Sequence, residues 1–216
     1  PITIPLDENK SAVENAKRYF EKYAKLKRTF EALTEQTKET KEEIDHLNSI
    51  SNALDIAREE EDLAAIRKEL SDTGYVRHHF QKGKQNARKA PKSKPLHYIS
   101  SDGFHMYVGK NNYQNDELTF KFATGNDWWF HAKAAAGSHV IVKTEGKELP
   151  DRTFEEAARL AAHYSKACEQ GKAEIDYIQK KHVKKPNGSK PGFVVYYTNY
   201  SMTISTDITG IKEVTE

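Results

Sequence analysis

Lysine side chains crowd together near the C-terminal end of the sequence without an acidic residue between them: Lys180, Lys181, Lys184, Lys185 and Lys190. His182 and Asn187 add polar groups to the same stretch. Clustered ammonium groups repel one another unless a polyanion approaches, and a phosphate backbone supplies that anion and releases its counterions. We therefore predict that Lys180, Lys181, His182, Lys184, Lys185 and Lys190 contact RNA, with a solvated charged loop as the alternative.

A second basic stretch covers residues 73–95, which contain seven basic residues and no acidic one: Arg77, Lys82, Lys84, Arg88, Lys89, Lys92 and Lys94. Flexible basic side chains contact phosphates and not base edges. We expect this stretch, including Arg77, to bind rRNA or tRNA without sequence specificity. The alternative is a basic linker that only keeps the chain soluble.

Aromatic and amide side chains are the other candidates for RNA contact. Adjacent strand residues point to opposite faces, so we predict that Trp128 and Phe130 are buried and that Trp129 faces outward, where unpaired bases stack on aromatic rings. Asparagine caps helices and tolerates turn geometry, which explains one or two members of the polar run 110–116. We predict ribose or phosphate contact for the others, and name Lys110, Asn111 and Asn112.

Four residues have the chemistry of a catalytic or metal site: Asp127, His131, Ser138 and His139. A nucleophile, a base and an orienting acid are one way to combine them, and two histidines with a carboxylate as metal ligands are another. Neither combination has a diagnostic spacing, and no Gly-x-Ser-x-Gly or His-Glu-x-x-His motif accompanies them. We expect structural hydrogen bonds from these residues, and no enzymatic activity, cofactor or metal.

The elements that position these residues form a mixed α/β domain with one main helix. We predict a hairpin of strands 96–99 and 104–109, a short helix over 111–122, strands over 128–133 and 138–143, a helix over 153–169, and strands over 173–183 and 193–205 around an Asn187-Gly188 turn.

The first 72 residues predict a helical arm. Apolar residues recur with 3,4 spacing from Ala16 to Leu47, which is the seam of a coiled coil, and Ser11 with Glu14 forms a capping-box pattern. We expect polar residues 48–52 to interrupt the helix, and a second helix over 53–70, with Ile56, Leu63, Ile66 and Leu70 inward, to fold back on it. The second helix is too short to cover the first, so half of the seam needs a preceding helix or a second copy.

The fold class is therefore α+β, with an antiparallel coiled-coil arm at residues 1–72, a basic linker at 73–95 and an α/β domain at 96–216. The net charge of +2 conceals an acidic arm, with 12 basic against 17 acidic residues, and a neutral last domain, with 15 of each. The single cysteine, Cys168, excludes an internal disulfide, which fits a reducing cytosol. No window approaches the roughly 18 apolar residues of a membrane span, so we expect a cytoplasmic protein without membrane contact.

Several motifs, in consistent order, resemble the NFACT family: Ser101-Asp102-Gly103-Phe104, Val108-Gly109-Lys110-Asn111-Asn112, Asp127-Trp128-Trp129-Phe130-His131 and Gly137-Ser138-His139-Val140. They are similar to the NFACT-R domain, and Lys184-Lys185-Pro186 with Lys190-Pro191-Gly192 resembles its ending. Ile4-Pro5-Leu6-Asp7 and Asn15-Ala16 resemble the second half of the family's coiled-coil middle region.

This resemblance implies a role in ribosome-associated quality control. Bacterial family members bind large ribosomal subunits obstructed by peptidyl-tRNA and recruit alanyl-tRNA for untemplated C-terminal alanine tails. The resemblance implies that the coiled coil reaches the stalk base and that the NFACT-R domain helps to hold tRNA. Two alternatives stay open: a fibronectin-binding adhesin, a name that family members have carried, and a tRNA-processing enzyme, which would require clustered carboxylates for Mg²⁺.

Overall fold

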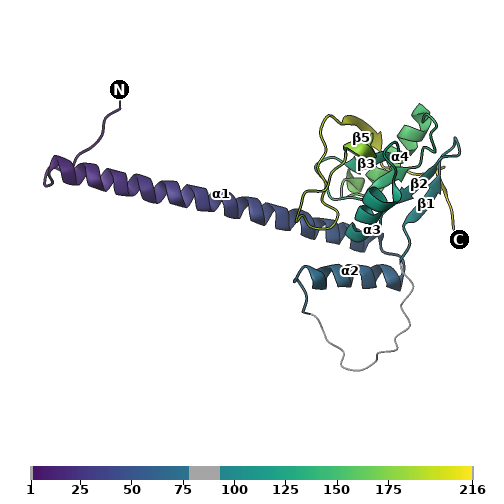
Figure 1. The fold of residues 1–216 in the computed structure, drawn as a ribbon, viewed down its shortest axis with the longest axis horizontal. Helices are drawn as coiled ribbons and strands as arrows, with labels where there is room; N and C mark the ends of the chain where they lie inside the picture. The colour runs from purple at the N-terminus through teal and green to yellow at the C-terminus, as the bar shows by residue number, and fades with distance from the viewer. Residues whose placement is uncertain (1, 78–92, 216) are drawn as a thin grey trace. The chain divides into compact units, whose positions relative to one another are not determined.

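The computed structural model describes residues 2–77 and 93–215 of the chain (Figure 1). The linker positions Lys82, Lys84, Arg88, Lys89 and Lys92 lie outside the described residues. The chain divides into two compact units, residues 1–45 and 46–216. The division falls inside the predicted arm and not at the basic linker, because the last turns of the first helix pack with the second unit.

The first unit contains the start of helix α1 (Ala12–Ile56), which the predicted capping box initiates. The Ser11 amide donates to Glu14 Oε2 at 2.8 Å, and the Glu14 amide donates to Ser11 Oγ at 3.3 Å. The buried Asn15 ties the preceding residues to the helix, since its Oδ1 accepts from the Asp7 amide at 2.8 Å. The capping box predicted from Ser11 and Glu14 is therefore confirmed.

The apolar seam of α1 is exposed along the first unit: Tyr23, Leu26, Phe30 and Leu33 are each 55–72% exposed. Within the described part of the chain, no second helix covers them. The seam of the first unit is therefore exposed in the structure, and its covering by a preceding helix or a second copy stays a prediction. Isolated apolar side chains on a surface are ordinary, but a continuous row of them on one helix is typical of an interaction surface.

Helix α1 continues through residues 48–52, where the sequence predicted a break. That prediction was wrong because the polar side chains there find partners without leaving the helix. Ser49 Oγ donates to the His46 carbonyl at 2.7 Å, and Asn52 Nδ2 donates to the Tyr164 carbonyl at 3.2 Å. The turn comes at residues 57–59, where Asp62 accepts the Arg58 amide at 2.9 Å and starts α2 (Glu60–Asp72).

Helix α2 packs beside the C-terminal end of α1 in the second unit (Figure 1). Ile66 is buried against Ile50 and Ala53, whereas Ile56 enters the core of the sheet domain. Leu63, predicted to face inward, is 51% exposed. The inward face of this short helix is partly polar instead, since it buries Asp62 and Glu69.

The second unit is built on a seven-stranded antiparallel sheet in the order β6-β5-β3-β4-β2-β1-β7. Its strands are β1 (Leu96–Ile99), β2 (His105–Val108), β3 (Trp128–Ala132), β4 (Val140–Val142), β5 (Lys172–Gln179), β6 (Tyr200–Ser205) and β7 (Lys212–Glu213). The predicted first hairpin is confirmed, with Leu96 opposite Val108 and Ile99 opposite His105. Residues 193–199 do not form a strand, apart from an isolated bridge between Lys184 and Val195, so β6 begins later than predicted.

Helix α4 (Asp151–His163) covers one face of the sheet, where its buried alanines and Leu160 pack with Phe130, Val140 and Ile175. It ends before residue 169, contrary to prediction, because the Tyr164 carbonyl accepts the Ser138 amide at 2.9 Å and Ser165 forms a bridge with Gly137. A turn (Cys168–Gln170) then leads into β5.

The opposite face is covered by α3 (Asn112–Glu117), the π-helical turn that follows it (Leu118–Phe122), and residues 194–196. Leu118, Trp129, Ile141 and Ile178 form a second buried cluster there. The sheet is therefore packed on both faces, so aromatic residues on either face can be buried. None of the described helices is both long and apolar enough to cross a membrane.

Candidate nucleic-acid interface

The predicted lysine cluster forms a structured loop, residues 180–192, which we call the basic loop. It leaves β5 through a short helical turn (Lys180–His182) and is closed by the bridge between Lys184 and Val195, whose two backbone hydrogen bonds are both 2.9 Å. Val183 is buried and anchors the loop, while Lys181, His182 and Lys184 are exposed. The loop therefore presents positive charge from a fixed backbone.

Helix α3 holds the far side of the basic loop. Asp116 forms an ion pair with Lys185, and its second carboxylate oxygen accepts the Gly192 amide at 3.1 Å. Gly192 has a φ of +80°, and a Cβ there would lie 2.5 Å from Asn112 Oδ1, so only glycine fits without displacement. An acidic residue distant in sequence thus neutralises Lys185, which the local sequence did not reveal.

Two further lysines of the loop lie over aromatic rings. Lys190 Nζ is 3.2 Å from the Tyr75 hydroxyl and 5.6 Å from the centre of that ring, and Lys180 Nζ is 5.8 Å from the centre of Phe120. These contacts position the side chains and leave their charge uncompensated. The Lys180, Lys181 and Lys184 ammonium groups form no ion pair with the described residues, which makes them the strongest candidates for phosphate contact.

The polar run after β2 is buried, including Lys110 and Asn111, for which we predicted contact with ribose or phosphate. Asn111 caps α3, because its Oδ1 accepts the Gln114 amide at 3.0 Å. The Gln114 side chain in turn accepts the Lys110 amide at 2.9 Å. The Lys110 ammonium lies 2.5 Å from Asp62 of α2, and both side chains are less than 10% exposed. These residues build the junction between the helical arm and the sheet.

Asn112 is also buried, and it connects the arm with the basic loop. Its Nδ2 donates to Ser49 Oγ and to Glu69 Oε1, each at 2.7 Å, and its Oδ1 faces Gly192. Glu69 Oε1 is also 3.0 Å from His46 Nε2. The Asn112 amide nitrogen therefore already has two partners within the fold, and the Asn112 side chain lies between the end of α1 and the basic loop.

Trp129 is fully buried, and the prediction that it faces outward was wrong. Its ring centre lies 4.9 Å from that of Tyr196 and 5.1 Å from that of His139. The predicted alternation along β3 is correct, since Trp129 and Phe130 belong to different clusters. The error came from treating one face of the sheet as solvent-exposed. Trp128, on the opposite face from Trp129, is the tryptophan that reaches the surface.

His131 and His139 lie where burial disfavours their charged forms. Burial lowers the pKa of His131, and burial together with the neighbouring His131 lowers that of His139 well below its usual value. His139 Nδ1 is 2.8 Å from Thr119 Oγ1, and its backbone amide donates to Asn115 Oδ1 at 3.0 Å. Ser138 Oγ is buried and makes no hydrogen bond to any described residue, so it is not paired with either imidazole.

Asp127 lies at the start of β3, where it holds a loop. Its carboxylate accepts the Thr124 amide at 2.7 Å and the Thr144 amide at 2.9 Å, and it pairs with the Lys143 ammonium. Burial acts to raise its pKa, but the Lys143 ammonium and these amides outweigh burial and lower it. Across residues 2–77 and 93–215, no group of three histidine, cysteine or carboxylate side chains is arranged to hold a metal ion.

The residues that sequence reasoning missed are the supports of the basic loop, Asp116 and Tyr75. Asp116 is 69 residues from its partner Lys185, and Tyr75 is 115 residues from Lys190. Asp116 lies beside Asn115 in the polar run 110–116, for which we predicted contact with RNA and not an ion pair with a lysine. Nothing local in the sequence distinguishes Tyr75. Arg77, a predicted RNA contact, is exposed at the end of the described arm.

The structure joins a helical arm to an antiparallel sheet domain that is packed on both faces and carries a fixed lysine-rich loop, which defines an α+β class of protein. Residues 1–89 match the family described as the NFACT N-terminal and middle domains, and residues 94–197 match the NFACT protein RNA binding domain. The chain therefore belongs to the NFACT family.

Proteins similar to this chain include the Rqc2 homolog RqcH of Bacillus subtilis, which is 40% identical over 95% of this chain and 35% of its own length. RqcH of Streptococcus pneumoniae is 40% identical over 96% of this chain and 36% of its own length. This chain thus spans about a third of the length of these curated relatives.

A solved structure with the same fold is the C-terminal part of the fibronectin/fibrinogen-binding protein from Streptococcus suis. It superposes with a TM-score of 0.77 at 40% identity, covering 93% of this chain and 78% of that one. The likeness therefore includes the arm as well as the sheet domain.

Proposed function

We propose that this chain is the RNA- and ribosome-binding part of a ribosome quality-control factor, and that the basic loop contacts RNA phosphates. The observation that carries the proposal is the fixed backbone of this loop, which keeps Lys180, Lys181 and Lys184 without an acidic partner among the described residues. Like-charged groups held in this way attract a polyanion, and an ordered loop loses little conformational entropy on binding.

We also propose a finer role, which is the one that the resemblance to the RqcH relatives implies. In it, the whole protein binds obstructed large subunits, its coiled coil reaches the stalk base, and the sheet domain helps to hold alanyl-tRNA while alanine tails are added to the stalled chain. The exposed apolar seam of α1 supports an arm that makes contacts outside this sequence. We place the protein in the cytoplasm.

We further propose that the chain performs no chemical step of its own. In support, the residues first considered for catalysis have structural roles: His139 is held by Thr119, and Asp127 by Lys143 and two backbone amides. Peptide bond formation is then the task of the ribosome. Turnover of tRNA, peptide or nucleotide by the purified chain, lost in a His139→Gln variant that still folds, would contradict this proposal.

The test of ribosome binding is co-sedimentation of the chain with purified large and small ribosomal subunits. We expect it to pellet with large subunits, and a variant with Lys180, Lys181 and Lys184 all changed to Gln to remain largely in the supernatant. The matched control changes three exposed lysines, Lys133, Lys172 and Lys212, which lie at the other ends of β3 and β5 and on β7. Equal sedimentation of both variants would exclude the basic loop as the ribosome contact.

A second candidate function is supported by the Streptococcus suis relative, which is described as fibronectin/fibrinogen-binding. Under this alternative the chain would bind an extracellular host protein. Binding of the purified chain to immobilised fibronectin and fibrinogen distinguishes the two functions. Saturable binding that the lysine variant retains would favour an adhesin surface separate from the basic loop.

A further inference from the structure

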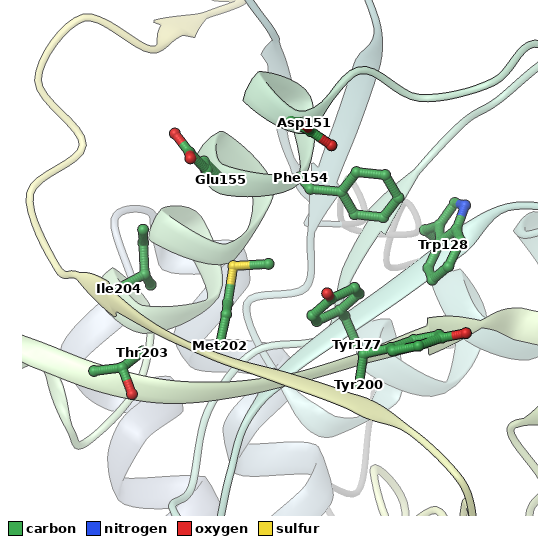
Figure 2. A pocket seen from close by; sticks show the side chains of 9 residues that line it. All are labelled: Trp128, Asp151, Phe154, Glu155, Tyr177, Tyr200, Met202, Thr203 and Ile204. Carbon is green, nitrogen blue, oxygen red and sulfur yellow. The ribbon is translucent and has the colours of Figure 1, made fainter.

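An aromatic groove lies on the α4 face of the sheet, between the N-terminal part of α4 and strands β5 and β6 (Figure 2). Its volume is about 510 Å³, and it is lined by Trp128, Asp151, Phe154, Glu155, Tyr177, Tyr200, Met202, Thr203 and Ile204. None of these residues belongs to the basic loop, residues 180–192. The groove is therefore separate from the basic loop.

Three rings form one wall of the groove. Tyr177 and Tyr200 are stacked with ring centres 5.5 Å apart and planes at 28°, and Trp128 lies 5.9 Å from Tyr177. Strand pairing sets this arrangement, because Tyr177 is opposite Tyr200 on β6 and Trp128 is opposite Gln179 on β5. Tyr200 is 60% exposed. The wall thus offers aromatic surface to a ligand from a rigid sheet.

Phe154 and Phe130 pack against these rings, Phe154 from α4 and Phe130 from β3. Phe154 meets Trp128 edge-on at 4.7 Å, and Phe130 stacks on Tyr177 at 5.5 Å with planes at 13°. Phe130 is fully buried, so the exposed rings rest on the core of the domain. Met202 and Ile204 continue the surface along β6, and a thioether adapts its shape to what it contacts. Such preorganised aromatic surface reduces the entropic cost of binding.

The opposite rim of the groove is acidic. Asp151 and Glu155 stand one turn apart on α4, and both are exposed (Figure 2). Within residues 2–77 and 93–215, neither carboxylate forms a hydrogen bond or an ion pair. The neighbouring Arg152 turns to Glu156, 3.4 Å away, and Lys180 lies over Phe120 on the other face of the sheet. The negative charge on this rim is therefore not compensated within the domain.

A groove lined by aromatic rings and by two exposed carboxylates is complementary to a cation. A guanidinium or ammonium group is attracted to the face of Trp and Tyr rings, and the carboxylates neutralise its charge. The same carboxylates repel phosphate, so the groove and the basic loop select ligands of opposite charge. Strand β6 is also the edge of the sheet, and no described strand pairs with its outer side, where an extended peptide can be added.

We propose that this groove binds an extended, basic segment of a partner protein, with an arginine or lysine side chain seated between Trp128, Tyr177 and Tyr200 and the carboxylates of Asp151 and Glu155. The segment runs along β6, so that alternate side chains point toward α4. This proposal does not rest on RNA binding by the basic loop. It gives the domain a protein-binding face in addition to its basic one.

The test is calorimetric titration with a peptide of about eight residues, long enough to span β6, that alternates arginine and threonine. A matched peptide with citrulline in place of arginine keeps the shape and removes the charge. We expect the arginine peptide to bind and the citrulline peptide to bind at least about tenfold more weakly. Tyr200→Ala, and separately Asp151→Asn with Glu155→Gln, should each weaken the arginine peptide about fivefold.

Tyr197→Ala and the pair Glu117→Gln with Glu169→Gln are the controls, because these side chains are exposed but lie outside the groove, and they should leave peptide binding unchanged. Equal binding of both peptides, no binding at millimolar concentration, or unchanged affinity in the groove variants would overturn the proposal. Weaker tRNA binding by Tyr200→Ala, with stronger binding after the carboxylates are neutralised, would also overturn it, because the groove would then accept RNA bases.

Discussion

The polar run 110–116 and the basic loop 180–192 are adjacent in space but have opposite environments. In the polar run, Lys110 and Asn112 are buried and satisfied by partners from the arm, whereas in the loop Lys181 and Lys184 are exposed. Both stretches are rich in groups that bind phosphate. The difference teaches that burial by a distant helix, and not residue type, decides which lysine is available to RNA.

The largest expected effect is the difference in the free energy of unfolding between variants of the buried Lys110 and the exposed Lys184. Lys110→Ala leaves Asp62 buried without its ammonium partner, which should lower the free energy of unfolding by about 3–5 kcal/mol. Lys184→Ala removes an exposed charge and should change it by less than about 0.5 kcal/mol. Urea unfolding followed by circular dichroism measures both. Similar costs for the two variants would show that the buried ion pair does not hold the arm to the sheet.

A smaller effect is expected at the contact between the two stretches. Gly192→Ala places a methyl group against Asn112 in addition to the strain of a positive φ, and should destabilise the protein by about 2–3 kcal/mol. Gly188 also has a positive φ, of +75°, but a Cβ there meets no atom within 4 Å. Gly188→Ala should therefore cost only about 1 kcal/mol. Equal melting temperatures of the Gly192→Ala and Gly188→Ala variants would mean that the basic loop does not pack against Asn112.

A pH effect tests the lowered pKa values of His131 and His139, set against the exposed His182 of the basic loop. Because the pKa values of His131 and His139 are lowered in the folded state, the unfolded chain binds protons more readily, and stability should fall as the pH drops below about 6.5. Each histidine contributes at most about 1.4 kcal/mol per pH unit. Thermal unfolding at pH 7.5, 6.5 and 5.5 measures the slope. The variant His182→Gln changes an exposed histidine and should keep the same dependence of stability on pH. Loss of that dependence in this variant would assign the effect to the basic loop.

The sequence predicted local structure well, and its failures came from contacts between distant segments. The capping pattern at Ser11, the hairpin at Asp102-Gly103 and the alternation along β3 depend on neighbouring residues, and all three are present. The burial of Trp129 depends on residues 194–196, and the continuation of α1 through Asn52 depends on Tyr164. Side-chain pattern indicates which residues share a face, but it does not indicate what covers that face.

The same limit explains the candidate site. Charge clustering identified the basic loop, and the family motifs identified the domain, but Lys110, Asn111 and Asn112 were assigned to RNA because their partners Asp62, Gln114 and Glu69 were not visible as partners in the sequence. Motifs that are specific to a fold often serve its packing. In this chain the motif of residues 108–112 builds the junction, whereas Lys184 lies in the motif that ends the domain, with Lys180 and Lys181 shortly before it.

The measurement that tests the central claim most directly is the salt dependence of tRNA binding, by fluorescence anisotropy, for the unchanged chain and the variant with Lys180, Lys181 and Lys184 changed to Gln. Each lost phosphate contact lowers the slope of log affinity against log salt by about 0.7–0.9. We predict a slope reduced by about 2–3, weaker binding and an unchanged melting temperature, with the Lys133, Lys172 and Lys212 control like the unchanged chain. An unchanged affinity and slope in the folded variant would contradict RNA contact by the basic loop.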